Sequence, residues 1–213
     1  MAIRKIARMG HPVLREKARQ LTKEEILSPD MKVFLQDMID TMNDYGGIGL
    51  AAPQVYESIA VAIVDYQDDH PRYAAETKAE GKAENQKSEK DSKGKPVLHS
   101  LPFTIVFNPK ITVLDSTEQS FWEGCLSVPE LRGLVARPRK VQIDFLDLKA
   151  QPRTVVVEGF LATVFQHELD HLEGIVYVDH VKTAPGKNVL SFTEEYTRFL
   201  APEEGDDVGE LPE

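Results

Sequence analysis

The chain has 213 residues, 41% of them hydrophobic and 28% charged, which suits one globular domain with a sizeable core. Its formal net charge of −10 argues against general nucleic-acid binding, because phosphate contacts require an excess of Lys and Arg. No apolar run is long enough to span a bilayer, the first residues lack the apolar region of a secretory signal, and a single Cys excludes an intramolecular disulfide. Together these features predict a protein of the reducing cytoplasm that makes no membrane contact.

The N-terminal part predicts an extended arm followed by a core helix. Residues 3–20 alternate short apolar and basic positions, with a turn or short helix expected near Pro12. Ser28 and Pro29 resemble an N-cap followed by Pro at the first helical position. Apolar residues then recur at helical spacing, and they are Met31, Phe34, Met38, Ile39 and Met42. This stripe predicts an amphipathic helix that faces the core and ends near Gly46.

A segment of small residues and a strand follow this helix. Residues 47–54 read G-I-G-L-A-A-P-Q, and their small side chains allow a close approach of the backbone to another group. The G-x-G within them is not a dinucleotide fingerprint, because no strand precedes it and the third Gly is missing. Residues 59–66 read I-A-V-A-I-V-D-Y, which predicts a strand.

The composition changes sharply after this strand. Residues 74–96 contain no Val, Ile, Leu or Phe, so the stretch cannot bury enough apolar area to pack. We therefore predict a mobile insertion over about residues 67–100, within a single domain of residues 1–200. Further strands are expected at residues 104–107, 111–114, 141–148 and 154–157, and a weak strand or helix at residues 189–200. Residues 201–213 hold six acids and no base, which predicts a disordered acidic tail.

The motif Q-H-E-L-D-H-L occupies residues 166–172 of a predicted buried helix. His167 and His171 are four positions apart, which places both imidazoles on one helix face. Glu168 follows the first His and can reach a water held by the same metal. This H-E-x-x-H pattern is typical of two metal-binding His and a Glu acting as general base. Apolar residues cover most other sides of the helix, and Gly174 is expected to end it as the C′ residue.

Two His leave a hydrolytic metal one protein ligand short. The single Cys, Cys125, lies in the segment E-G-C-L-S-V-P of residues 123–129. A buried structural thiol is the commonest fate of a free Cys, but the flanking Gly124 and Pro129 favour a shaped turn. Cys125 is therefore a candidate third ligand.

Three stretches together resemble the peptide deformylase family. They are G-I-G-L-A-A-P-Q from residue 47, E-G-C-L-S-V-P from residue 123 and Q-H-E-L-D-H from residue 166. H-E-x-x-H alone is weakly specific, whereas the three motifs in this order are highly specific. The resemblance extends over about residues 3–181, and it implies an α+β fold of small antiparallel or mixed β-sheets packed around a central helix that carries the motif. It also implies removal of the formyl group from the N-terminal formylmethionine of newly synthesised polypeptides.

The resemblance implies roles for individual residues. The implied metal ligands are Cys125, His167 and His171. Glu168 is the implied general acid and base, while Gln54 and the backbone N–H of Leu126 stabilise the developing oxyanion. The implied substrate-binding residues are Ile48, Gly49, Glu123, Gly124, Arg132, Phe160 and Val164. Gly49 and Gly124 are expected to pair their backbones with the extended peptide, and Arg132 and Arg137 to orient acidic residues such as Asp170.

The metal and the cellular partners follow from two kinds of argument. One thiolate and two imidazoles favour Zn²⁺ by ligand preference, whereas the resemblance implies Fe²⁺, with Zn²⁺, Ni²⁺ or Co²⁺ as substitutes. We expect Fe²⁺ physiologically.

Some family members end in a basic helix thought to dock on the ribosome, but here the acidic residues 201–213 should be repelled by ribosomal RNA. We therefore expect only transient encounters with the ribosome, and formylmethionyl nascent chains as substrates.

Two other functions remain open at this point. An H-E-x-x-H metalloprotease usually takes a third His or Glu ligand, and a formylmethionyl peptide assayed against an ordinary peptide separates the two activities. A non-catalytic metal-binding or scaffold protein would have no need of an intact Glu168, Gln54 and Cys125.

Overall fold

The computed structural model describes residues 2–66, 90, 94, 96–182, 187 and 189–200. Almost all of the predicted insertion and the whole of the predicted tail lie outside these residues. Val97 is buried and begins the short strand β3 (Val97–Leu98), so the chain returns to the sheet before residue 100, where the insertion was predicted to end. Within the described part of the chain, no helix combines the length and apolarity needed to cross a membrane.

The N-terminal prediction is confirmed. The arm contains one short 3₁₀ turn, η1 (Pro12–Arg15), and leads through α1 (Lys23–Ile26) into the long helix α2 (Pro29–Asp44). The Ser28 hydroxyl accepts the N–H of Met31 at 3.1 Å, which caps the first turn of α2. The apolar stripe of α2 faces inward, with Met38 fully buried.

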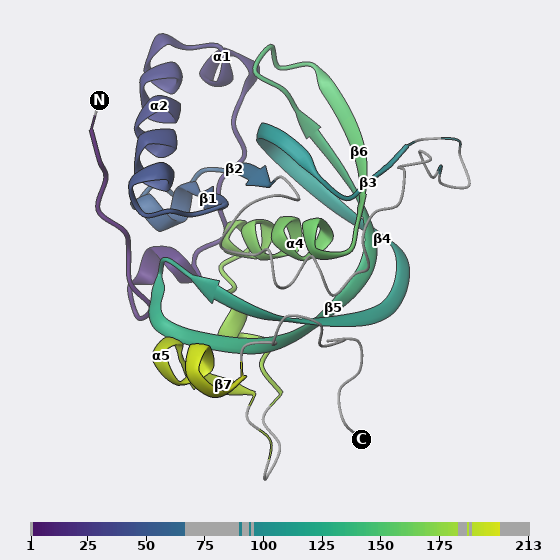
Figure 1. The fold of residues 1–213 in the computed structure, drawn as a ribbon. Coiled ribbons are helices and arrows are strands. Elements are labelled where there is room, and N and C mark those ends of the chain that lie inside the picture. Colours follow the sequence, from purple (N-terminus) through teal and green to yellow (C-terminus); the bar gives the residue numbers. More distant parts are fainter. Residues whose placement is uncertain are drawn as a thin grey trace.

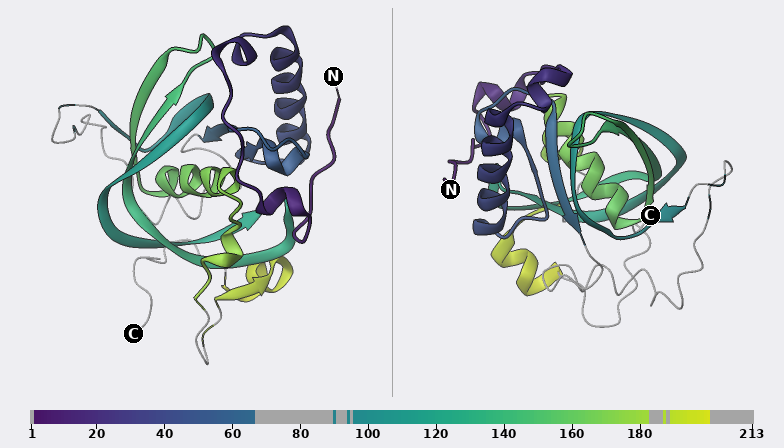
Figure 2. Two further views of the ribbon diagram at one scale, coloured as in Figure 1. Left: turned by 180° about the vertical axis from the view of Figure 1, so that it is seen from behind. Right: turned by 90° about the horizontal axis from the view of Figure 1, so that it is seen from above.

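Strand β2 (Val61–Tyr66) separates two hydrophobic cores. Alternate residues of a strand point to opposite faces, and β2 is buried on both of them. Val61 and Ile63 pack with α2 in the α2-side core, whose members include Met31, Phe34, Met38, Met42, Leu50 and Phe107. Ala62, Val64 and Tyr66 pack with helix α4 (Phe160–Leu172) in the α4-side core, whose members include Phe160, Leu161, Phe165, Leu169 and Leu172. Viewed from above, β2 runs between the two helices (Figure 2).

The sheet has seven strands in the order β1-β2-β4-β5-β6-β3, with β7 paired to β5. All described pairings are antiparallel except the parallel pair of β3 and β6. The remaining bounds are β1 (Gly49–Ala51), η2 (Ala52–Val55), β4 (Leu101–Cys125), β5 (Val128–Leu146), β6 (Pro152–Glu158) and η3 (Tyr177–Asp179). The predicted α+β class is therefore confirmed.

The strands predicted at 104–107 and 111–114 are present, but they are parts of one longer strand. Both belong to β4, which continues to Cys125, and the strand predicted at 141–148 is the end of β5, which begins at Val128. Register shifts occur between Phe107 and Lys110 and again near Asp115, and such bulges bend a strand without ending it. The polar middle of β4 was missed because its side chains are largely exposed and its order comes from pairing with β5. The two strands curve around α4 (Figure 1).

The described chain ends with β7 (Leu190–Phe192), α5 (Thr193–Glu195) and a π-helical turn, η4 (Tyr196–Leu200). β7 pairs with β5 at residues 131–133. The region predicted as a weak strand or helix thus contains both. It lies beside the β4–β5 hairpin (Figure 1).

Candidate active site

Helix α4 presents His167, Glu168 and His171 to the protein interior. Their exposed fractions are 8%, 5% and 0%. The spacing of four places the two imidazole centroids 5.1 Å apart, with the rings nearly perpendicular. Gly174 follows the helix with φ of +76°, as predicted, and a side chain there would overlap the backbone of Arg15. Apolar packing on the other sides of α4 fixes the direction of these three side chains.

Cys125 brings the third candidate ligand from the sheet. It is the last residue of β4, where residues 126–127 turn the chain into β5. Its Sγ lies 3.3 Å from Nε2 of His171, and the ligand atoms of Cys125, His167 and His171 lie within 4.8 Å of one another. Burial would raise the pKa of the Cys125 thiol, but the adjacent imidazoles lower it well below its usual value. The thiolate, which is the ligating form, is therefore favoured.

This donor set fits a divalent transition metal. A soft thiolate with two imidazoles is a combination that Zn²⁺ and Fe²⁺ accept. The Oε2 atom of Glu168 is buried beside the cluster and has no hydrogen-bond partner among the described residues. Since a buried polar atom without a partner is costly, a group that donates a hydrogen bond to this oxygen belongs at this position.

A buried ion-pair chain orients His167. The Glu123 carboxylate lies 2.7 Å from Nδ1 of His167, which directs Nε2 of the ring toward Cys125. Arg137, 4% exposed, binds Glu123 through two hydrogen bonds of 2.5 and 3.0 Å. Burial would raise the pKa of Glu123, but the hydrogen bonds from His167 and Arg137 lower it. Glu123 is thus held as an anion that fixes the imidazole.

The chain of ion pairs continues to the protein surface. Nη1 of Arg137 donates to Asp170 at 2.7 Å, and Asp170 also lies 2.8 Å from Nε2 of His180. The expectation that a basic residue of this region orients Asp170 therefore holds for Arg137. It fails for Arg132, whose side chain lies over the Gly124 backbone and the ring of Tyr196 instead.

Gln54 enters the site from η2 with its amide nitrogen facing the sulfur. Its Oε1 accepts the N–H of Ala51 at 2.8 Å, which fixes the orientation of the amide group. Nε2 consequently points to Sγ of Cys125 at 3.4 Å and to the hydroxyl of Ser127 at 3.3 Å. The N–H of Ser127 also lies 3.4 Å from this sulfur. Several N–H donors therefore surround the sulfur.

Glu168 is a buried carboxyl with a raised pKa. Burial raises its pKa to about 7, with the charges of His167 and His171 acting in the opposite direction. A carboxyl with that pKa can hold or release a proton near neutral pH. Gly49 approaches so closely that any side chain there would overlap the Glu168 carboxylate. This close approach explains the small residue in the first motif.

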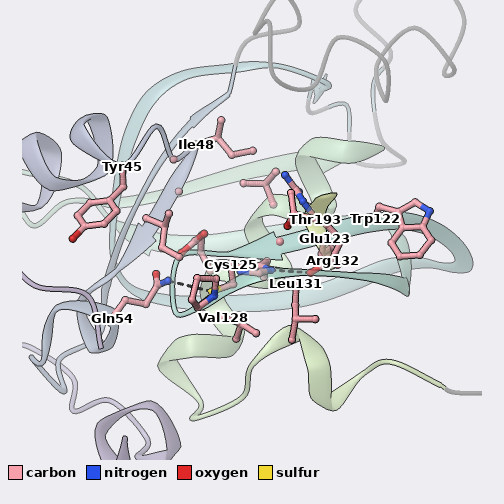
Figure 3. Close-up of a pocket in the computed structure, with 18 of the residues that line it drawn as sticks. Tyr45, Ile48, Gln54, Trp122, Glu123, Cys125, Val128, Leu131, Arg132 and Thr193 are labelled. Atoms are coloured by element: carbon pink, nitrogen blue, oxygen red, sulfur yellow. Dashed lines mark hydrogen bonds and ion pairs between the residues drawn. The ribbon is translucent and has the colours of Figure 1, made fainter. Parts of the chain in front are cut away.

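The site opens into a cavity of about 380 Å³ (Figure 3). It is lined by every substrate-binding residue expected from the sequence, namely Ile48, Gly49, Glu123, Gly124, Arg132, Phe160 and Val164. Gln54, Cys125, Leu126, His167 and Glu168 also line it, whereas the fully buried His171 lies behind them.

The sequence did not point to other residues of this cavity. They are Arg8 from the N-terminal arm, Tyr45 from the end of α2, Trp122 from β4 and Thr193 from α5. The stacking of Tyr177 on His167, with centroids 5.9 Å apart, was also missed. Ser127 stood within a recognised motif, but its position beside Cys125 gave no sign of its two contacts.

The chain is similar to known proteins in sequence and in fold. The sequence model of the polypeptide deformylase family matches residues 3–186. A peptide deformylase of Leptospira biflexa is 37% identical over 183 residues, which are 86% of this chain and 90% of that protein. A crystal structure of class I type b peptide deformylase from Acinetobacter baumannii with Met-Ala-Ser bound gives a TM-score of 0.70 at 31% identity, covering 85% of this chain and 100% of that chain. A peptide deformylase structure from Thermotoga maritima gives 0.66 at 28% identity, with 86% and 100% covered.

The fold and the site thus define an α+β enzyme with a Cys-His-His cluster beside a buried carboxyl group. The chain belongs to the polypeptide deformylase family. Enzymes of this family remove an N-formyl group.

Proposed function

We propose that this protein removes the formyl group from the N-terminal formylmethionine of newly synthesised polypeptides. The observation that carries the proposal is the convergence of Cys125, His167 and His171 beside Glu168 in the cavity, within a member of the deformylase family. The bound Met-Ala-Ser of the Acinetobacter baumannii structure supports a peptide that begins with Met as the occupant of this cavity.

Cys125, His167 and His171 would hold one divalent ion, which we propose to be Fe²⁺, with Zn²⁺, Ni²⁺ or Co²⁺ as substitutes. When bound, the ion supplies Lewis acidity, which makes water nucleophilic near neutral pH and polarises the substrate carbonyl. Glu123 holds the His167 ring for ligation through its 2.7 Å contact with Nδ1.

Glu168 would move the proton of the reaction. The water oxygen forms a bond to the formyl carbon, the bond from that carbon to the methionine nitrogen breaks, and formate and a free amine leave. Glu168 accepts a proton from the attacking water and gives it to the departing nitrogen. Its pKa of about 7 suits both directions of transfer.

Gln54 and Leu126 would stabilise the oxygen that becomes negative when the formyl carbon is attacked. The Nε2 group of Gln54 already faces the site, because Oε1 is held by Ala51. Preorganised donors of this kind act without reorientation during the reaction, and losing one typically costs about 10²–10³ in kcat.

The cavity would bind the N-terminal residues of the peptide. Ile48, Phe160 and Val164 offer apolar surface to the methionine side chain, while Gly49 and Gly124 leave their backbones accessible to an extended chain. Its volume of about 380 Å³ lies in the usual range of ligand sites, so residues beyond the methionine also fit in part. The formyl carbon carries only hydrogen, so a close-fitting wall can exclude larger acyl groups.

The test is an anaerobic preparation assayed for metal content and for turnover on the same sample. We expect formate release from formyl-Met-Ala-Ser, no deacylation of acetyl-Met-Ala-Ser, and no cleavage of internal peptide bonds. Cleavage of an ordinary peptide without formate release would identify a metalloprotease instead. Stoichiometric metal with neither activity would identify a metal-binding protein without this reaction.

A further inference from the structure

The N-terminal arm reaches both segments that carry the proposed oxyanion donors. The N–H of Ala7 donates to the carbonyl of Gln54 at 2.8 Å, and the N–H of Met9 donates to the carbonyl of Ser127 at 2.8 Å. The intervening Arg8 extends its side chain to the turn between β4 and β5, where Nη1 donates to the carbonyl of Leu126 at 2.6 Å. Three consecutive residues of the arm thus hold the two sides of the site in one relative position.

Arg8 is placed for this contact rather than for an internal ion pair. Its side chain lies on the exposed rim of the cavity, and no ion pair of Arg8 is found with any described residue. The bond to Leu126 is short and charge-assisted, and such bonds are about twice as strong as neutral ones. The partners lie 118 positions apart in the sequence, so the contact forms only when the arm docks on the finished hairpin.

The peptide unit between Leu126 and Ser127 is held at both ends. Its carbonyl oxygen accepts from Arg8 at 2.6 Å, and its N–H, which belongs to Ser127, points to Sγ of Cys125 at 3.4 Å. Fixing this unit restricts rotation about the Leu126 backbone, and the neighbouring N–H of Leu126 is the proposed oxyanion donor. Leu126 joins this unit to the one that carries its own N–H, so the direction of that N–H depends on how the unit beside it is held.

We propose that Arg8 is a positioning residue that sets the direction of the Leu126 N–H by holding the adjacent peptide unit. The inference rests on the proposed function, since it concerns the same donor. Arg8 acts here through the Leu126 backbone and does not itself contact the reacting atoms. A donor displaced by a fraction of an ångström stabilises the transition state less while substrate binding is little changed.

The test compares Arg8→Met, Arg8→Gln and Arg8→Lys with Lys5→Met in the full chain loaded with the same metal. Lys5 is an exposed cation of the same arm outside the cavity, so it is a matched control. The substrate is formyl-Met-Ala-Ser with an amidated C-terminus, which offers no carboxylate for Arg8 to attract. Metal content, melting temperature, kcat and KM are measured for each variant. Gln keeps a polar side chain that is too short for the bond. Arg8→Gln therefore provides the measurement if Arg8→Met folds poorly.

We expect kcat of Arg8→Met and Arg8→Gln to fall about tenfold, less than the 10²–10³ for outright loss of a donor. KM, metal content and melting temperature should stay at wild-type values, Arg8→Lys should recover most of the loss, and Lys5→Met should match the wild type. An unchanged kcat, a change in KM alone, a loss of metal, or an equal fall in Lys5→Met would each overturn the proposal. Wild-type turnover tests the proposed function separately, so the two failures are distinguishable.

Discussion

The two cores on either side of β2 differ in what they enclose. In the α2-side core, apolar residues such as Met38, Ile63 and Phe107 fill the space between helix and sheet. On the other side, α4 carries His167, Glu168 and His171 into the interior, where burying polar groups is costly unless they are paired. One face of the strand therefore serves stability, whereas the other includes a polar site whose groups require partners.

That polar site is tolerated because distant segments supply the partners. Glu123 comes from β4 and Arg137 from β5, and together they engage the imidazole of His167 and the carboxylate of Asp170. Two atoms are exceptions, because Oε2 of Glu168 and Nδ1 of His171 have no hydrogen-bond partner among the described residues. Of these two groups, Glu168 lines the cavity and has its pKa raised to about 7, so it is the one expected to exchange protons.

The sharpest test of this difference is Glu168→Gln. We expect turnover to fall by about 10²–10⁴, the usual contribution of a general acid or base. The metal content should stay at that of the wild type, because Glu168 lies outside the Cys-His-His cluster. Formate release and bound metal are measured on the same anaerobic sample. A variant with substantial activity would show that another group moves the proton.

Cys125→Ala should remove metal binding, which Glu168→Gln leaves intact. Without the thiolate, two imidazoles remain, and we expect the purified variant to lose most of its metal and therefore its activity. Metal analysis with Glu168→Gln as the retained-metal control checks this. Stoichiometric, tightly bound metal in Cys125→Ala would place the third ligand elsewhere.

Arg137→Met should reveal the cost of the buried charges. Removal of one partner leaves Glu123 and Asp170 without their shared cation, and breaking such a buried pair typically costs about 3–5 kcal/mol. Denaturant unfolding measures the change. Arg139→Met on the same strand is the control, because Arg139 is largely exposed and its pair with Glu158 should contribute little. Equal effects of the two substitutions would contradict this account.

Met38→Ala tests whether the α2-side core contributes to stability without positioning the site. Met38 is fully buried, and truncating a buried Met typically costs about 2–5 kcal/mol. At a temperature where the variant is folded, we expect kcat to stay within about twofold of the wild type, since the site is supported chiefly from α4 and the hairpin. A large fall in kcat of the folded variant would show that both cores position the site.

The smallest effect is expected in the turn between β5 and β6, where Asp147 forms surface contacts. Asp147 accepts N–H groups from Gln151 and Lys149 and pairs with Arg153, and these contacts lower its pKa to about 2. The unfolded chain has a value of about 3.9, so the ionised form stabilises the fold above that pH and the contribution is lost as the pH falls toward 2. Asp147→Asn should therefore melt slightly lower than the wild type at pH 7, and the difference should shrink below pH 4. A difference that grows in acid would reverse the assigned sign.

Local patterns predicted the elements whose order is set by neighbours in sequence. The stripe of α2, the spacing of His167 and His171, and the glycine that ends α4 all act within a few residues, so the sequence displays them directly. The long strands were predicted poorly because the polar middle of β4 is ordered by its partner β5. Tyr196 packs against Trp122, which lies 74 positions earlier, and the sequence around neither residue predicts the contact.

The sequence by itself determined helices α2 and α4, the apolar strand β2 and, through three motifs, the residues that gather at the site. Helical spacing and motif chemistry are short-range properties, and they do not depend on how the chain is later folded. Only the tertiary structure decided that Glu123 orients the His167 ring and that Arg137 pairs with Glu123. It also decided that Arg8 donates to the Leu126 carbonyl. These contacts join residues 14 to 118 positions apart, and their geometry exists only after the strands curve around α4.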